Sequence, residues 1–205
     1  FLPMAGALFI LTIRDADQAI VARNARYVAL WASSINFLLS LYLWFNFDGS
    51  TSAFQFVEKA EWMPVFELSY HMGVDGISVL FVMLTTLLTP ICILASWDTI
   101  KDRVKEYMIS FLILETLMVG MFCALDLVVF YIFFEGVLIP MFMIIGVWGG
   151  PRRVYSAFKL FLYTLAGSVL MLLAMFAMYF DAGTTDITKL LTHGFPTDMQ
   201  TWLWL

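Results

Sequence analysis

The sequence predicts an all-α protein, a polytopic bundle of transmembrane helices, from its composition and from the spacing of its apolar residues. Of 205 residues, 62% are apolar and 13% are charged, whereas soluble domains are about 45–50% apolar and about 25% charged. The apolar residues form runs of about 20, the length of a helix that crosses about 30 Å of hydrocarbon. Backbone groups in lipid must be hydrogen-bonded within their own segment, so these runs are predicted to be helices.

Five complete spans are expected, and they cover roughly residues 27–47, 76–96, 107–125, 127–148 and 156–180. Residues 1–13 resemble the end of an earlier span, and residues 199–205 resemble the start of a later one. We therefore interpret residues 1–205 as a single membrane domain and as a fragment of a longer protein.

The charged residues predict the orientation and exclude one class of partner. The net charge of −5 argues against binding to nucleic acid, which favours a basic face. Lys and Arg are concentrated in the connections 14–26, 97–106 and 149–155, while the alternate connections carry few. Basic loops stay on the cytoplasmic side, so these three are expected to face the cytoplasm or the mitochondrial matrix, with the lipid bilayer around the spans.

Glu135 is the first candidate functional residue because it lies deep within a predicted span. It follows Leu127 by eight residues, which is roughly 12 Å at 1.5 Å per residue. A carboxylate in the hydrocarbon is costly, rare and usually functional, and burial disfavours its charged form. Pro140 also frees the carbonyl of Gly136 from its helical hydrogen bond. We predict that Glu135 binds and releases a proton; the alternative is an ion-paired or permanently protonated structural group.

Two further charged residues are candidates for proton transfer. Glu115 precedes Asp126 by eleven residues and Glu135 follows it by nine, so a tight hairpin places both carboxylates at nearly the same depth. If their faces meet, their titrations are coupled; otherwise Glu115 faces a polar patch on a neighbouring helix. Lys159 lies near the start of its span, where it either reaches the headgroups or joins a water-linked relay.

No cofactor site is expected in this chain. The sequence has no CxxC pair, no glycine-rich phosphate loop and no nucleophile–base constellation. His71 and His193 are interpreted as solvated loop residues, the alternative being a ligand or a proton entry point. Movement of protons or other ions is the remaining class of function.

Four segments resemble the family of subunit M of bacterial NADH-quinone oxidoreductase, which is chain 4 of mitochondrial respiratory complex I. They read FYIFFEGVLIPMFMIIGVWGG, HMGVDGISVLFVMLTTLLTP, ALDLVVFY and FKLFLYTLAGSVLML. The resemblance extends from about Ala29 to Thr188. It implies an antiporter-like membrane-arm subunit in a bacterial cytoplasmic membrane or in the mitochondrial inner membrane.

The resemblance also implies residue roles and partners. Glu135 matches the key intramembrane Glu of the family, which pairs with a Lys on a later, broken helix expected beyond Leu205. Lys159 matches a position where some relatives have Lys, whereas Glu115 is a candidate from its depth alone. The expected partners are other membrane-arm subunits of complex I. NADH, FMN, iron–sulfur clusters and quinone are expected in other subunits of that oxidoreductase.

Two alternative functions remain open at this point. Multisubunit Na⁺/H⁺ antiporters share the fold and the intramembrane Glu, so the chain is alternatively a subunit of a cation/proton exchanger. The other alternative is a passive membrane scaffold in which Glu135 is locked in an ion pair.

Overall fold

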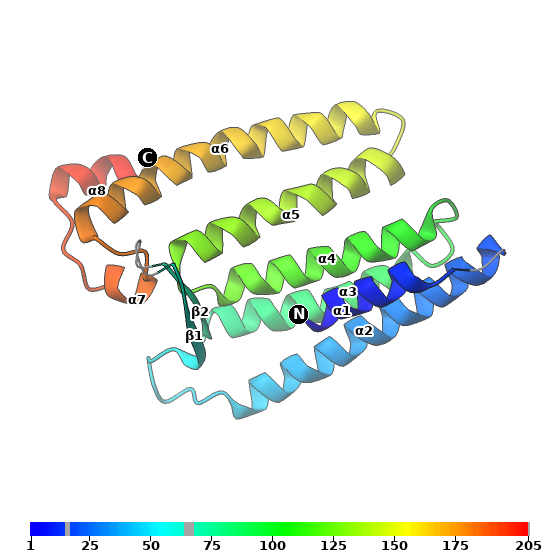
Figure 1. Cartoon of the computed structure of the whole chain (residues 1–205), viewed down its shortest axis with the longest axis horizontal. Coiled ribbons are helices and arrows are strands. Elements are labelled where there is room, and N and C mark those ends of the chain that lie inside the picture. The colour runs from blue at the N-terminus through cyan, green and yellow to red at the C-terminus, as the bar shows by residue number, and fades with distance from the viewer. Residues whose placement is uncertain (15–16, 64–67, 205) are drawn as a thin grey trace.

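The computed structural model describes residues 1–14, 17–63 and 68–204, and within them five long helices and one shorter helix lie side by side (Figure 1). In order, its elements are α1 (Leu2–Thr12), α2 (Gln18–Asn46), β1 (Gln55–Met63), β2 (Leu68–Val74), α3 (Ser78–Ala95), α4 (Val104–Cys123), α5 (Leu127–Trp148), α6 (Arg153–Ala182), α7 (Ile187–Leu190) and α8 (Thr197–Trp204). Within these residues, helices α2 to α6 are long and apolar enough to cross a membrane. The predicted fold class is therefore confirmed.

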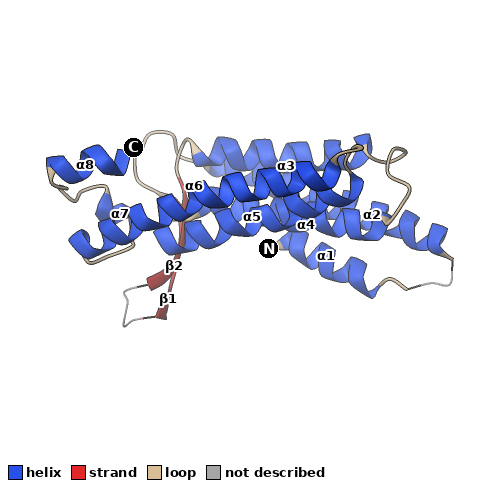
Figure 2. Ribbon diagram, turned by 90° about the horizontal axis from the view of Figure 1, so that it is seen from above, coloured by secondary structure: helices blue, strands red, loops and turns tan. Residues whose placement is uncertain are grey.

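Helix α4 is central, packing against α1, α2, α3 and α5, whereas α6 packs mainly against α5 (Figures 1 and 2). The core lies where α1, α2 and α4 meet, around Ile10, Ala29 and Leu112. Small residues permit the close packing of α1 on α2: a Cβ on Gly6 would lie only 2.7 Å from that of Ala32. Small residues at interfaces are typical of membrane helices, because they let backbones approach each other.

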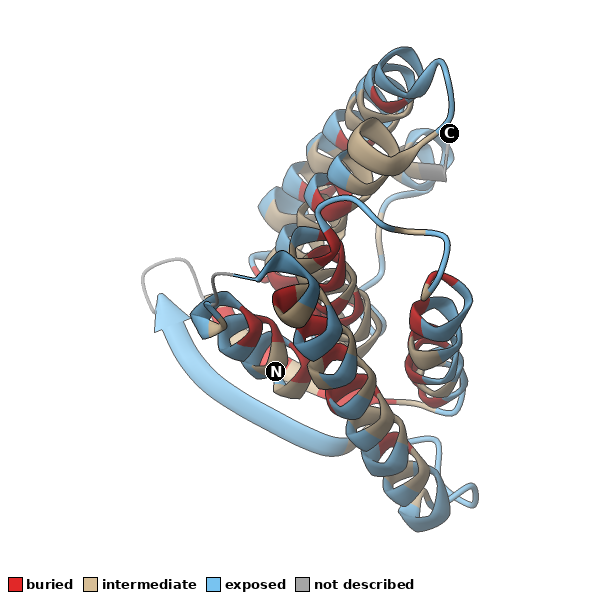
Figure 3. Ribbon diagram, turned by 90° about the vertical axis from the view of Figure 1, so that its right-hand side faces the viewer, coloured by how far each residue is buried: buried red, intermediate tan, exposed pale blue. Residues whose placement is uncertain are grey.

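The outward surface of the bundle is strongly apolar. Figure 3 shows the buried residues gathered between the helices and the exposed ones on the outer faces. On α6, for example, Leu170 is 68% exposed and Phe180 is 82% exposed. Apolar side chains on outer faces are suited to contact with lipid or with other apolar helices.

The connection from α2 to α3 contains an antiparallel β-hairpin of β1 and β2, which the sequence analysis did not predict. The strand β2 alternates between partly buried and buried residues over most of its length. The backbone N–H of Leu125 donates to the carbonyl of His71 at 2.9 Å. The hairpin is thereby fixed across the α4–α5 turn, at one end of the bundle (Figure 1).

Several helix ends differ from the expected span limits. Helix α2 begins at Gln18, so Arg23 and Arg26 lie on a helix and not in the expected connection 14–26. Helix α6 extends from Arg153 to Ala182, beyond 156–180 at both ends. Helix ends extend past the hydrocarbon, so their polar turns lack the apolar signal that defines a span. The expected partial spans correspond to α1 and α8, while Leu205 lies outside the described residues.

Candidate functional site

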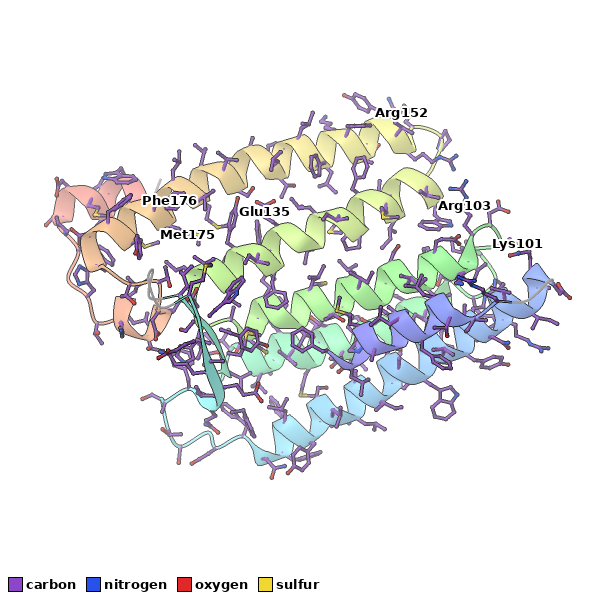
Figure 4. The ribbon with its side chains drawn as sticks, in the orientation of Figure 1. Lys101, Arg103, Glu135, Arg152, Met175 and Phe176 are labelled. Atoms are coloured by element: carbon purple, nitrogen blue, oxygen red, sulfur yellow. The ribbon has the colours of Figure 1, made fainter. Side chains whose placement is uncertain are left out.

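Glu135 lies in the middle part of α5 and is positioned toward α6 (Figure 4). The side chain is partly buried, and its Oε1 atom is fully buried without a hydrogen-bond partner among the described residues. Tyr131, one helical turn earlier, interacts with both Glu135 and Ser168. Ser168 lies on α6 and is 3% exposed. Glu135 therefore sits in a small polar environment between two apolar helices.

Close packing of α4 on α5 determines this orientation. A Cβ on Gly136 would lie 3.1 Å from Leu117, and a Cβ on Gly120 would lie 2.5 Å from the ring of Phe133. Gly136 and Phe133 thus face α4. Successive residues of a helix are rotated by about 100°, so Glu135 is turned away from this contact, toward α6.

Glu115 is a second buried carboxylate, on the central helix α4, and is 1% exposed. Its Oε1 atom accepts a hydrogen bond of 2.8 Å from the Asn36 side-chain amide of α2. Its Oε2 atom is buried and has no partner within the described part of the chain. Glu115 also lines an otherwise largely apolar cavity of about 250 Å³ between α3 and α4, which includes Thr85 and Thr89.

The structure does not bring the three predicted site residues together. Glu115 faces α2 and α3, whereas Glu135 faces α6, so the two carboxylates have different neighbours. Of the two interpretations of Glu115, the structure favours a polar contact with a neighbouring helix. Lys159 is exposed on α6 and has no ion pair among the residues described.

A polar cluster at the hairpin end of the bundle was not predicted from the sequence. Asp126 is fully buried, caps α5 through the backbone N–H groups of Val128 and Val129, and accepts a 2.5 Å hydrogen bond from Thr185. Its neighbour in the cluster, Asp186, forms a 2.7 Å ion pair with Lys59 of β1. Asp residues immediately before helices are typical N-caps, and this is the signal in the sequence that indicates both positions.

The interpretation of His71 as a solvated loop residue is wrong. His71 is 6% exposed, and its Nδ1 atom lies 3.3 Å from the carboxylate of Asp186. Burial alone would raise the pKa of Asp186, but the hydrogen bonds from Lys59 and Thr188 and the nearby charges lower that pKa to about 2. Asp186 is therefore a charged group at neutral pH that joins the hairpin to the segment after α6.

Within residues 1–14, 17–63 and 68–204, no group of three or more His, Cys, Asp or Glu side chains is arranged to hold a metal ion. The arrangement instead provides isolated carboxylates at separate places inside a helical bundle. Such groups are suited to binding and releasing single protons.

Comparison with known proteins gives two family-model matches that together cover most of the chain. Residues 20–125 match the amino-terminal model of NADH-ubiquinone oxidoreductase chain 4. Residues 124–205 match the transmembrane model shared by NADH:quinone oxidoreductase and Mrp antiporters.

Curated relatives agree with these matches. The chain is 55% identical to NADH-quinone oxidoreductase subunit M of Rhodobacter capsulatus over 196 residues, 96% of this chain and 38% of that protein. It is 48% identical to NADH-ubiquinone oxidoreductase chain 4 of Marchantia polymorpha over 205 residues, 100% of this chain and 41% of the relative. The chain thus spans about two fifths of the length of these relatives.

Two solved structures have the same fold. Respiratory complex I from Thermus thermophilus contains a chain that matches with a TM-score of 0.83 and 27% identity, over 99% of this chain and 40% of that one. An Mrp complex from a Dietzia species matches with a TM-score of 0.81 and 20% identity, over 98% of this chain and 22% of that one. The Dietzia match indicates a common fold only.

Proposed function

The chain belongs to the NADH-ubiquinone oxidoreductase chain 4 family, and from this premise we propose that it forms part of a proton-translocating membrane-arm subunit of respiratory complex I. In this proposal Glu135 is the proton-binding group. The observation that carries the proposal is a carboxylate in the middle of a membrane helix with one buried, unpaired oxygen atom.

The proposed mechanism follows from the electrostatics of that position. In a medium of low dielectric, the charged form of a carboxylate is stabilised strongly by a nearby cation and destabilised when the cation withdraws. A Lys that moves toward and away from Glu135 would therefore make it release and bind a proton. Tyr131 and Ser168 supply hydroxyl groups on the α6 side, through which a proton reaches or leaves the carboxylate.

The other two candidates have subordinate roles in the proposal. Glu115 is a second proton-binding group, held by Asn36 beside the cavity between α3 and α4. Lys159 is exposed on α6 and precedes Ser168 by nine residues, which is roughly 13 Å along the helix. We therefore assign it to the headgroup region and not to a direct ion pair with Glu135.

The partners and cofactors follow from the family. Other membrane-arm subunits flank the chain in the proposed complex, in a bacterial cytoplasmic or mitochondrial inner membrane. Oxidation of NADH and reduction of quinone, with FMN and iron–sulfur clusters, take place in other subunits and supply the energy.

The decisive experiment measures proton pumping and NADH:quinone activity in membranes carrying Glu135→Gln. The variant is nearly isosteric but cannot bind and release a proton, so both activities are expected to fall by an order of magnitude or more in an assembled complex. Native gel electrophoresis verifies the assembly. Glu115→Gln and Lys159→Gln are measured in parallel, with a smaller loss expected for the first and little change for the second.

Each alternative function predicts a different result. Normal pumping in the Glu135→Gln complex would contradict the proposed role and favour a structural carboxylate. A requirement for Na⁺ in proton movement, without NADH-dependent activity in the purified assembly, would favour the cation/proton exchanger.

A further inference from the structure

A basic pocket lies at the end of the bundle opposite the β-hairpin. It has a volume of about 720 Å³ and is formed by the α3–α4 connection, the end of α5 and the start of α6. Its lining includes Lys101, Arg103 and Arg153. Figure 4 shows Arg152 at the α5–α6 turn, on the same end of the molecule as Lys101 and Arg103.

The pocket is held open by hydrogen bonds between side chains and backbone carbonyls. The indole N–H of Trp148 donates to the carbonyl of Asp102 at 2.8 Å, which joins the end of α5 to the α3–α4 connection. Arg153 donates to the carbonyl of Val147 at 2.8 Å. Outside the pocket, Arg26 donates to the carbonyl of Ile100 and holds the same connection against α2. The walls are therefore fixed by the protein itself.

Two basic side chains of the lining, and a third on the neighbouring α5–α6 turn, have no such structural role. Lys101, Arg103 and Arg152 are exposed and make no hydrogen bond or ion pair with other residues that the structure describes. The positive-inside rule explains basic residues on this side of the membrane. The rule does not explain why several unpaired basic side chains lie close to one cavity.

Arg103 is the N-cap of α4, and its side chain makes no capping hydrogen bond. The guanidinium is therefore not used to close the helix end and remains available at the pocket that Arg103 lines.

The rest of the lining is apolar and belongs to the ends of membrane helices. Ile100, Gly146, Val147 and Val154 form this part of the wall, and Val154 is 58% exposed. A site with cationic groups at the rim and apolar groups facing the bilayer fits an amphiphile with a negative headgroup. Basic pockets between membrane helices on the cytoplasmic or matrix side are suited to acidic lipids.

We propose that this pocket binds the phosphate headgroup of an acidic phospholipid, with Lys101 and Arg103 as its principal ligands and Arg152 beside them. Asp102 also lines the pocket, and its negative charge is outweighed by those of Lys101, Arg103 and Arg153. A bound lipid would join the α3–α4 and α5–α6 connections and so fix the helix that carries Glu135.

The test places the photo-cross-linker p-benzoylphenylalanine at position 154 of the full-length subunit. The intact complex is reconstituted in vesicles of phosphatidylcholine with a minor share of phosphatidylglycerol, irradiated, and its lipid adducts are identified by mass spectrometry. Phosphatidylglycerol adducts are expected well above the share of that lipid in the bilayer. The same cross-linker at position 169, on the exposed side of α6, is expected to report the bulk composition.

Charge variants make the test specific. Each basic residue near an acidic membrane contributes about 1 kcal/mol, so Lys101→Gln/Arg103→Gln is expected to lower the preference for phosphatidylglycerol about thirtyfold. Arg14→Gln/Arg23→Gln removes two charges from the same side outside the pocket and is expected to keep the preference. Lys101→Arg/Arg103→Lys is also expected to keep it, which separates loss of charge from misfolding.

Three results would overturn the proposal. One is an adduct composition equal to the bulk bilayer in the unmodified pocket. Another is cross-linking to a protein segment in place of lipid, which would show that an acidic segment covers the site. The third is loss of the phosphatidylglycerol preference on addition of inorganic phosphate, which would assign the pocket to a soluble anion.

Discussion

At the scale of single residues, the contact between Gly120 and Phe133 is one of the close contacts between α4 and α5. A Cβ at position 120 would lie 2.5 Å from the Phe133 ring, so Gly120→Ala forces the ring or the helix to move. We expect a loss of about 1–3 kcal/mol, as for other overpacked sites. The measurement is the thermal stability of the purified complex. Gly167→Ala on α6 is the control, because no atom lies within 4 Å of its added Cβ.

Single residues also show which parts of the candidate site a sequence can indicate. Glu135 and Glu115 are candidates because a carboxylate within an apolar run is conspicuous whatever its partner. Their partners were not found: Asn36 is 79 residues away from Glu115 in sequence, and an Asn near the middle of a span has many alternative contacts. Which groups face a buried carboxylate depends on helix rotation and on packing at positions such as Gly136, which a single sequence does not determine.

At the scale of elements, the ion pair of Lys59 with Asp186 connects the β-hairpin to α7. We expect Asp186→Asn to destabilise the hairpin end by about 1–3 kcal/mol, because hydrogen bonds to a charged acceptor are lost. Since the folded-state pKa is depressed to about 2 from 3.8, this stabilisation is complete above the unfolded value and is lost as the pH falls toward about 2.

The measurement is thermal stability against pH for both proteins. The difference in thermal stability between the unmodified protein and Asp186→Asn is expected to stay constant from neutral pH down to about pH 4. Below that pH the difference is expected to narrow, in line with the depressed pKa of Asp186. Asp48→Asn is a suitable control, because the Asp48 carboxylate accepts bonds only from nearby Ser50 in the described structure. A difference that already narrows near neutral pH would contradict the assignment of the effect to the Asp186 carboxylate.

The elements differ in how far the sequence predicted them. The span expected at 127–148 has the same limits as α5, because Asp126 and Gly149 flank a continuous apolar run. The hairpin was missed because it lies outside the apolar runs: β1 is almost wholly exposed, and the buried face of β2 is made by Ser69, His71, Gly73 and Val74. The residues on the buried face of β2 are largely polar or small, so a hydropathy pattern does not reveal the strand.

At the scale of the whole molecule, the basic connections and the β-hairpin lie at opposite ends of the helices (Figure 1). The α1–α2, α3–α4 and α5–α6 connections share one end, in agreement with the alternation of charge along the sequence. Lys and Arg near span ends resist translocation. We therefore expect the end with the basic pocket to face the cytoplasm or matrix, and the hairpin with Asp186 to face the other side.

Two glycines allow a direct test of this orientation. Gly49 lies in the connection before β1 and Gly150 in the α5–α6 turn, and an added side chain meets no atom within 4 Å at either position. With Cys92 and Cys123 replaced by Ser, we expect Gly150→Cys to react with a membrane-impermeant maleimide only in inverted vesicles. Gly49→Cys is expected to react only in right-side-out vesicles. Reaction of Gly150→Cys from the outside would show that the orientation is the reverse of the one expected. The basic pocket would then lie on the side that the positive-inside rule does not favour. Binding of a local ligand would in that case be the remaining explanation for its basic residues.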